Sequence, residues 1–389
     1  MPLGKGLTVG AALGVINTSR YQAAWCLEYS SESSPHRVIL SWVDWQDQAA
    51  PKLNHQVFVA RLTQTSSSPS MASSPSALLK LGQRLTGTVS TYTITKQLGE
   101  FIWLGSNKTG ETVVIKSARH FRIANERDVL KRFQSRTPYL RPLIDEIVDP
   151  ADPPAIVLKH LEDELLSSSN AKRMSGKEIK YVSKRILEAL KVLHEDGYVH
   201  TDIKMDNVMV NYASASQRES EQRFTDVQLA DLESTVHVTS RFCKNRDGIG
   251  TPIWRSPEAQ LGIEWGPPTD VWSFGTMVIS MIWGENFFIF KPKTPRGHED
   301  YELDILAKYH IYFGPYPPSY CDLANKETLM VLTYVMDTVP PEKIKPFSLA
   351  SQREISTEDK EFILRIMKLD PRDRPTAKEL LEDKWFDGM

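Results

Sequence analysis

The stretch His200–Val210 reads H-T-D-I-K-M-D-N-V-M-V and places acidic, basic and amide residues directly before an apolar run. Asp231 follows a second apolar segment, residues 227–230. In both places the polar residues are predicted on loops beside short strands, where a rigid scaffold can orient them. A single aspartate in such a loop is usually a solvated surface charge. The complete spacing instead indicates a catalytic site.

Four residues of these two loops have the side chains that phosphoryl transfer requires: Asp202, Lys204, Asn207 and Asp231. One carboxylate can take a proton from a hydroxyl nucleophile. The second carboxylate and the amide can hold Mg²⁺, and the lysine can neutralise the phosphoryl group in transit. The alternative interpretation is a polar hairpin with solvated charges.

The spacing H-x-D-x-K-x-x-N, followed by an aspartate after a strand, resembles the catalytic and metal signature of the eukaryotic protein kinases. Further similar segments occur in the order that the family has, and they are Val113–Lys116, Glu126, Gly250–Glu258, Asp270–Gly275 and Arg374. Lys204 and Thr251 resemble the serine/threonine type. Arg255 and the segment 310–317 resemble the cyclin-dependent, mitogen-activated and SR-protein kinase group. The resemblance covers about residues 92 to 386.

The resemblance implies a role for each matching residue. Lys116, oriented by an ion pair with Glu126, holds the α- and β-phosphates of ATP. Asp202 is the catalytic base and Lys204 contacts the γ-phosphate. Residues implied to bind the cofactors ATP and Mg²⁺ are Gly99, Lys116, Leu158, Leu161, Asn207 and Asp231, of which Asn207 and Asp231 bind the metal. His200 is expected to brace the catalytic loop.

The order of predicted elements indicates an α+β fold with two lobes. Strand-like runs and one helix occupy residues 92 to about 160, which predicts a small antiparallel β-sheet lobe. Longer helical patterns fill residues 161 to 386, and Ser175 with Glu178 forms a capping box before one of them. Residues 1–64 are interpreted as an ancillary extension, and the Ser/Pro-rich segment 65–91 as a linker.

Charge, hydropathy and cysteine content limit the expected binding partners and the cellular compartment of the protein. The 389 residues have a net charge of −2, so we expect no nucleic-acid partner. The resemblance, in turn, implies a protein substrate. The longest apolar stretch, residues 271–283, is shorter than the ~20 residues of a membrane span. The three cysteines form no C-x-x-C pair, so neither a disulfide framework nor a zinc site is indicated. We expect a cytoplasmic or nuclear protein, and the sequence leaves its oligomeric state open.

Several positions depart from the family pattern. The nucleotide-covering loop should read G-x-G-x-x-G, but residues 98–105 read L-G-E-F-I-W-L-G and the loop is about five residues short. Either the phosphate-covering turn is missing or an exon boundary is misplaced. Glu233 stands where the family has glycine, and Val114 narrows the adenine pocket. Thr201 replaces an arginine that receives a phosphate, so we expect activity without phosphorylation of the loop residues Ser234, Thr235, Thr239 and Ser240.

The resemblance therefore predicts an ATP-dependent serine/threonine protein kinase. The alternative is a pseudokinase that acts as an ATP-binding or scaffold module, because the nucleotide-covering loop is short. A small-molecule phosphotransferase is a third candidate, which Lys204, Ser256–Glu258 and Arg374 make less favourable because they belong to the protein-substrate machinery.

Overall fold

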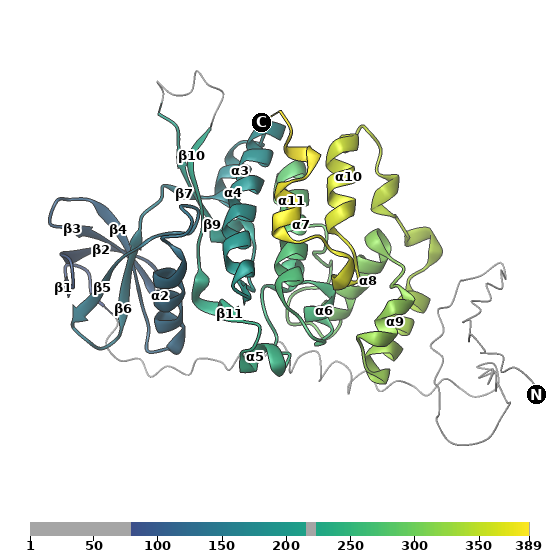
Figure 1. The fold of residues 1–389 in the computed structure, drawn as a ribbon, viewed down its shortest axis with the longest axis horizontal. Coiled ribbons are helices and arrows are strands. Elements are labelled where there is room, and N and C mark those ends of the chain that lie inside the picture. The colour runs from purple at the N-terminus through teal and green to yellow at the C-terminus, as the bar shows by residue number, and fades with distance from the viewer. Residues whose placement is uncertain (1–78, 215–222, 389) are drawn as a thin grey trace, which may run out of the picture.

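The chain forms two lobes connected at residues 160–162, as a computed structural model shows for residues 79–214 and 223–388 (Figure 1). The lobe on the left of Figure 1 contains strands and one helix, and the lobe on the right is mainly helical. This is the two-lobed α+β architecture that the sequence predicts. The predicted extension, residues 1–64, and most of the predicted linker lie outside the described residues.

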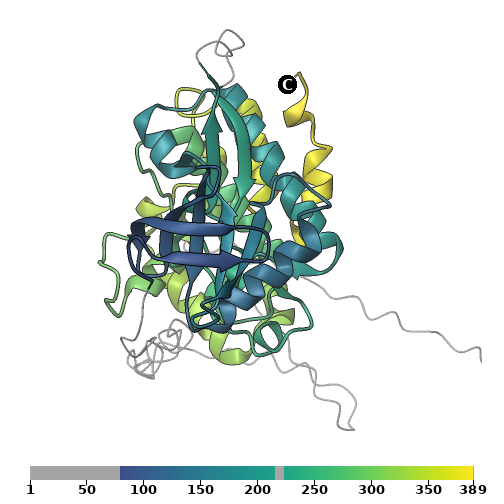
Figure 2. The same ribbon diagram turned by 90° about the vertical axis from the view of Figure 1, so that its left-hand side faces the viewer.

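The small lobe is a barrel of antiparallel strands with a helix beside it (Figure 2). The strand order β1-β2-β3-β4-β6-β5 closes on itself, because β1 pairs with β5 as well as with β2. Helix α2 contacts β5 and β6. The elements are β1 (Arg84–Gly87), β2 (Thr91–Gly99), β3 (Ile102–Asn107), β4 (Thr112–Ser117), α2 (Phe121–Phe133), β5 (Leu143–Asp149) and β6 (Ala155–Lys159).

The folded chain begins earlier than the sequence predicts, because β1 lies inside the segment 65–91 that was expected to be a linker. Leu85 of β1 is fully buried in the barrel. The turn after β1 is held by Asp145 of β5, whose carboxylate accepts hydrogen bonds from the backbone N–H groups of Thr88, Val89 and Ser90. A four-residue strand with one buried apolar side chain has too little periodicity to be detected from sequence.

Successive side chains of β4 point alternately into the barrel core and toward the space between the lobes. Val113 and Ile115 belong to the core inside the barrel. Val114 belongs instead to the larger core that continues into the helical lobe. Because successive side chains of a strand point to opposite faces, Lys116 lies on the same face as Val114. This face is directed toward α2 and the cleft.

The large lobe contains most of the helices. They are α3 (Leu165–Ala171), α4 (Gly176–Glu195), α5 (Arg241–Lys244), α6 (Pro257–Gln260), α7 (Pro267–Trp283), α8 (Tyr301–Phe313), α9 (Lys326–Thr338), α10 (Thr357–Ile366) and α11 (Ala377–Leu381). Its short strands are β7 (Asp163–Glu164), β8 (Tyr198–Val199), β9 (Val208–Tyr212), β10 (Phe224–Leu229) and β11 (Val236–His237). Two loops that follow strands of this lobe, 200–207 after β8 and 230–235 after β10, contain the predicted site residues Asp202, Lys204, Asn207 and Asp231.

Two helices confirm sequence predictions directly. Helix α4 begins with the predicted capping box, in which the Ser175 side chain accepts from the Glu178 backbone and the Glu178 side chain accepts from the Ser175 backbone. Helix α7 is buried on nearly all sides and contacts α4 and α10.

In the described part of the chain no helix is both long and apolar enough to cross a membrane. Cys243 is a buried free thiol.

Candidate active site

Lys116 lies at the centre of a buried ion-pair network. Its Nζ atom is 2.9 Å from Oε2 of Glu126 on α2 and 2.7 Å from Oδ1 of Asp231. Burial disfavours the charged amine, but the two carboxylates outweigh this effect and raise the pKa of Lys116 above its ordinary value. Lys116 is therefore a permanent cation that connects the small lobe to the loop after β10.

The loop that contains Asp231 is fixed by its neighbours. Asp231 has a left-handed backbone (φ 65°, ψ 57°), and the next backbone N–H, that of Leu232, donates to Glu126. Burial opposes ionisation of Asp231, but the charge and hydrogen bond of Lys116 hold its pKa below the usual value. Glu233 has no positive φ, so the substitution for glycine introduces no backbone strain here. Its carboxylate lies 3.1 Å from Nη1 of Arg122 on α2.

Asp202 occupies the middle of a second network, in the catalytic loop. Its Oδ1 atom accepts hydrogen bonds from both the backbone N–H and the hydroxyl of Thr251, each at 3.0 Å. Its Oδ2 atom is 2.9 Å from Nζ of Lys204. Asn207 donates from Nδ2 to the backbone oxygen of Asp202 at 2.8 Å. The aspartate is therefore oriented from three sides and keeps a cation beside it.

Helix α7 anchors this loop through Asp270. The carboxylate of Asp270 accepts the backbone N–H groups of His200 at 2.7 Å and Thr201 at 2.9 Å. The His200 ring is fully buried and contacts the backbone oxygen of Ala230 at 3.1 Å, which joins the two loops as the sequence predicts for a bracing residue. Thr201 has a positive φ of 74°, so the bonds to Asp270 hold a strained backbone in place.

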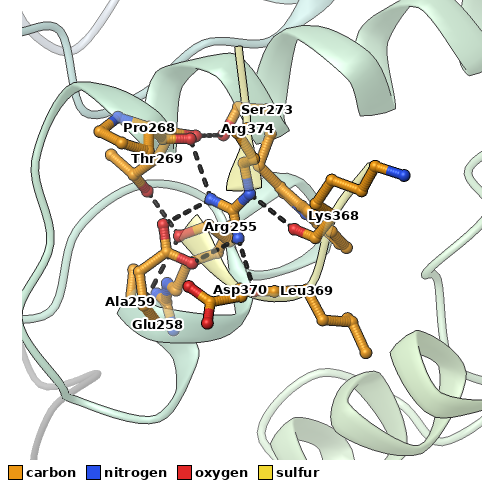
Figure 3. Close-up of polar contacts among 12 residues, drawn as sticks. Arg255, Glu258, Ala259, Pro268, Thr269, Ser273, Lys368, Leu369, Asp370 and Arg374 are labelled. Carbon is orange, nitrogen blue, oxygen red and sulfur yellow. Dashed lines mark hydrogen bonds and ion pairs between the residues drawn. The ribbon is translucent and has the colours of Figure 1, made fainter. Parts of the chain in front are cut away.

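The segment from Asp231 to Glu258 ends at a buried ion pair, drawn in Figure 3. Arg374 binds both carboxylate oxygens of Glu258, at 2.7 and 2.8 Å, and both side chains are completely buried. Arg374 also donates to the backbone oxygens of Pro268, Lys368 and Leu369. The pair that the resemblance implies is thus formed, and it fixes α6 to the C-terminal helices.

The model of the family described as protein kinase domain matches residues 80–386. The chain belongs to the protein kinase family. The match begins before residue 92, in agreement with the position of β1.

Curated relatives of this kinase domain are serine/threonine kinases. The protein kinase PAK mbt of Drosophila melanogaster is 27% identical over 341 residues, which are 86% of this chain and 43% of that protein. PAK 4 of Homo sapiens is 27% identical over 228 residues, 58% of this chain and 30% of that protein. The chain thus spans less than half the length of these relatives.

A solved structure has the same fold. A chain in the crystal structure of the yeast RNA Pol II CTD kinase CTDK-1 complex superimposes with a TM-score of 0.63 at 18% identity, covering 81% of this chain and 97% of that chain. At this identity the likeness shows the fold alone. The predicted similarity to the cyclin-dependent, mitogen-activated and SR-protein kinase group therefore stays a prediction.

The nucleotide-covering turn of this kinase is short, as the sequence predicts. Strand β2 ends at Gly99 and β3 begins at Ile102, and these two residues are paired. Gly99 has open space where a Cβ would be, so this position does not require glycine. Leu158 pairs with Val114 across β6 and β4, and both Leu158 and Leu161 are buried.

The structure thus brings together Lys116, Glu126, Asp202, Lys204, Asn207 and Asp231, and it leaves Gly99 at the tip of a turn. Sequence reasoning missed three contributors: Arg122 and Asn125 on α2, and Arg141 before β5. The side-chain amide of Asn125 donates to the backbone oxygens of Glu233 and Thr235. These partners are more than 100 residues apart in sequence, so no local pattern could have revealed them.

Proposed function

We propose that this chain is an ATP-dependent serine/threonine protein kinase, which transfers the γ-phosphate of ATP to a Ser or Thr hydroxyl of a protein. The observation that carries the proposal is the pair of assembled networks, Glu126–Lys116–Asp231 and Lys204–Asp202–Thr251. Side chains that are already held in place need little reorganisation during the reaction.

Asp202 is the group that accepts the proton. As the substrate hydroxyl oxygen forms its bond to the γ-phosphorus, the bond from that phosphorus to the β–γ bridging oxygen breaks. The hydroxyl proton passes to Asp202, whose carboxylate is oriented by Thr251. Lys204, at 2.9 Å from Asp202, offsets the charge of the transferred group. Lys116 binds the α- and β-phosphates of the ADP that is the leaving group.

The donor set fits a magnesium ion. Asn207 uses its Nδ2 group on Asp202, so its amide oxygen is the atom left for a metal. Asp231 uses Oδ1 on Lys116, which leaves Oδ2. Carboxylate and amide oxygens are suitable ligands for Mg²⁺. A bound magnesium ion neutralises phosphate charge as it develops in the reaction.

A cavity of about 390 Å³ beside the catalytic loop supports a protein substrate. Thr201, Asp202 and Thr251 line it on the catalytic side, and Phe242 and Tyr301 line it elsewhere. A serine or threonine side chain presented by an extended polypeptide would reach Asp202 through this cavity.

One observation favours a second candidate, a nucleotide-binding or scaffold module without turnover. Only Glu100 and Phe101 lie between the paired residues Gly99 and Ile102, so the turn offers few backbone N–H groups to phosphates. This loss weakens phosphate binding, but it removes none of the groups that act on the hydroxyl or the γ-phosphate.

The test is magnesium-dependent transfer of labelled γ-phosphate from ATP to a generic basic protein by the full chain. We expect Asp202→Asn to reduce transfer by about 10²-fold or more. The matched control is Asp128→Asn, because Asp128 is exposed on α2, and it should retain transfer. Equal transfer by the native chain and Asp202→Asn contradicts the kinase proposal. An ATP-induced rise in melting temperature without transfer favours the scaffold module.

A further inference from the structure

Arg141 is a charged residue placed in the interior between the lobes. Its backbone N–H donates to the carbonyl oxygen of Leu229 at 2.8 Å, and the preceding Leu140 forms a bridge to the same residue. Leu229 ends β10, two residues before Asp231. The backbone of Arg141 is therefore attached directly beside the metal-binding loop.

The side chain of Arg141 extends from that position to the connection between the lobes. Its Nε atom donates to the carbonyl oxygen of Lys159, the last residue of β6, at 2.8 Å, and the residue is only 6% exposed. The charges of Glu126 and Asp231 act on the guanidinium. Burial, and after it the charge of Arg141, lower the pKa of His160. The guanidinium thus lies between the Lys116 network and residues 159–160, at the inner end of the cleft.

Among the described residues no carboxylate forms a direct ion pair with this guanidinium, although the charges of Glu126 and Asp231 reach it. Neither of its terminal nitrogens donates a hydrogen bond to a residue in 79–214 or 223–388. Burial lowers the pKa of Arg141 to about 10, so the group is still protonated at neutral pH. The terminal nitrogens are not among the fully enclosed side-chain atoms that lack a partner, so they border open space in which another molecule can supply acceptors. The position therefore calls for a ligand with acceptor atoms.

We propose that Arg141 binds the purine base of the bound nucleotide and favours a 6-oxo purine, guanine or hypoxanthine, over adenine. The proposal rests on the proposed function, since it assumes that a nucleotide binds in this cleft. It changes the preferred base of the phosphate donor and leaves the phosphate-binding and catalytic groups as described.

The chemistry of the two bases supports this choice. Guanidinium has five donors and no acceptor. Guanine presents two acceptors, O6 and N7, which arginine binds with both terminal nitrogens, whereas adenine presents the donor N6–H₂ beside N7. Arg141 also donates to the carbonyl oxygen of Lys159, which leaves that oxygen one lone pair instead of two for an amino group such as that of adenine. ATP remains a donor because the phosphate contacts are common to all three nucleotides.

The experiment measures equilibrium binding of GTP, ITP and ATP, each with Mg²⁺, to the full chain by calorimetry. We expect GTP and ITP to bind about tenfold more tightly than ATP, within the discrimination that one bidentate contact gives. Inosine has O6 but lacks the 2-amino group, so ITP should follow GTP. The variant Arg141→Gln should reverse the preference toward ATP, because glutamine can donate to N7 and accept from N6. The matched control is Arg136→Gln, on the same connecting segment but partly exposed and paired with Asp196.

Each outcome decides the proposal. Tighter binding of GTP and ITP, reversed by Arg141→Gln and unchanged by Arg136→Gln, supports it. Tighter or equal binding of ATP by the native chain overturns it, and leaves the kinase proposal intact. Binding of ATP only after Arg141→Gln also overturns it, because the native arginine then blocks the nucleotide site instead of binding the base. If no nucleotide binds to either folded chain, both the base preference and the kinase proposal fail.

Discussion

Replacing Glu258 by glutamine is the most direct test of the packing that supports the active site. Glu258 and Arg374 are both completely buried and are joined by two hydrogen bonds of 2.7 and 2.8 Å. Glu258→Gln keeps the shape of the side chain and removes its charge. The guanidinium of Arg374 then stays buried with only neutral acceptors around it.

The expected cost follows from the geometry. Removing one partner of a fully buried pair costs about 3–5 kcal/mol. A folded domain of about 300 residues has an unfolding entropy near 0.6 kcal/mol/K, so this cost lowers the melting temperature by about 5–8 °C. Arg374→Met should be more damaging than Glu258→Gln, because it also leaves the carbonyl oxygens of Pro268, Lys368 and Leu369 without this donor.

Thermal unfolding followed by circular dichroism measures this effect. The control is Glu361→Gln, which removes an exposed partner of Lys384 at 3.4 Å and should change the melting temperature by less than about 2 °C. We also expect Glu258→Gln to reduce phosphate transfer, since α6 ends the segment that orients Asp202 through Thr251. If Glu258→Gln melts within 2 °C of the native chain, the buried pair does not have the role described here.

Three further predictions concern the site and the small lobe. Treatment with phosphatase should leave transfer activity within about twofold, because the hydroxyl of Thr201 already binds the backbone oxygen of Ser234; a phosphate-dependent recovery of activity would contradict this. Lys116→Met should lower transfer by at least about 10²-fold in the same assay, since it removes the cation between Glu126 and Asp231. Asp145→Asn should cost about 2–3 kcal/mol in urea unfolding at pH 7. Burial alone would raise the pKa of Asp145, but hydrogen bonds from the turn after β1 outweigh it and lower this pKa. The difference in unfolding free energy between the native chain and Asp145→Asn should therefore be complete above about pH 4 and shrink as the pH falls through the lowered pKa.

The sequence predicts most of the site because its chemistry is confined to short segments. Asp202, Lys204 and Asn207 lie within six residues, and the strand alternation around Lys116 places this side chain on the cleft face. The capping box of α4 and the apolar run of α7 are local signals of the same kind. These features need no knowledge of distant partners, and the structure confirms their positions.

The features that the sequence does not predict depend on contacts between distant segments. Strand β1 is stabilised by Asp145, more than 50 residues away. No local pattern in the sequence marks Arg141 as buried, and charged residues are seldom buried. The pairing of Glu233 with Arg122 spans 111 residues. In each case a tertiary contact determines the environment of a residue whose type alone suggests something else.

The closed barrel of the small lobe has a consequence for assembly. A sheet whose last strand pairs with its first leaves little unpaired edge among the described residues: β1 pairs with β2 at residues 91–93 and with β5 at Ile147 and Asp149. Proteins that recruit partners by strand addition need such an edge, and open edges also promote aggregation. Where β1 closes the sheet, we therefore expect a protein that docks on this lobe to recognise side chains, on α2 or on the turns between strands, rather than to extend the sheet.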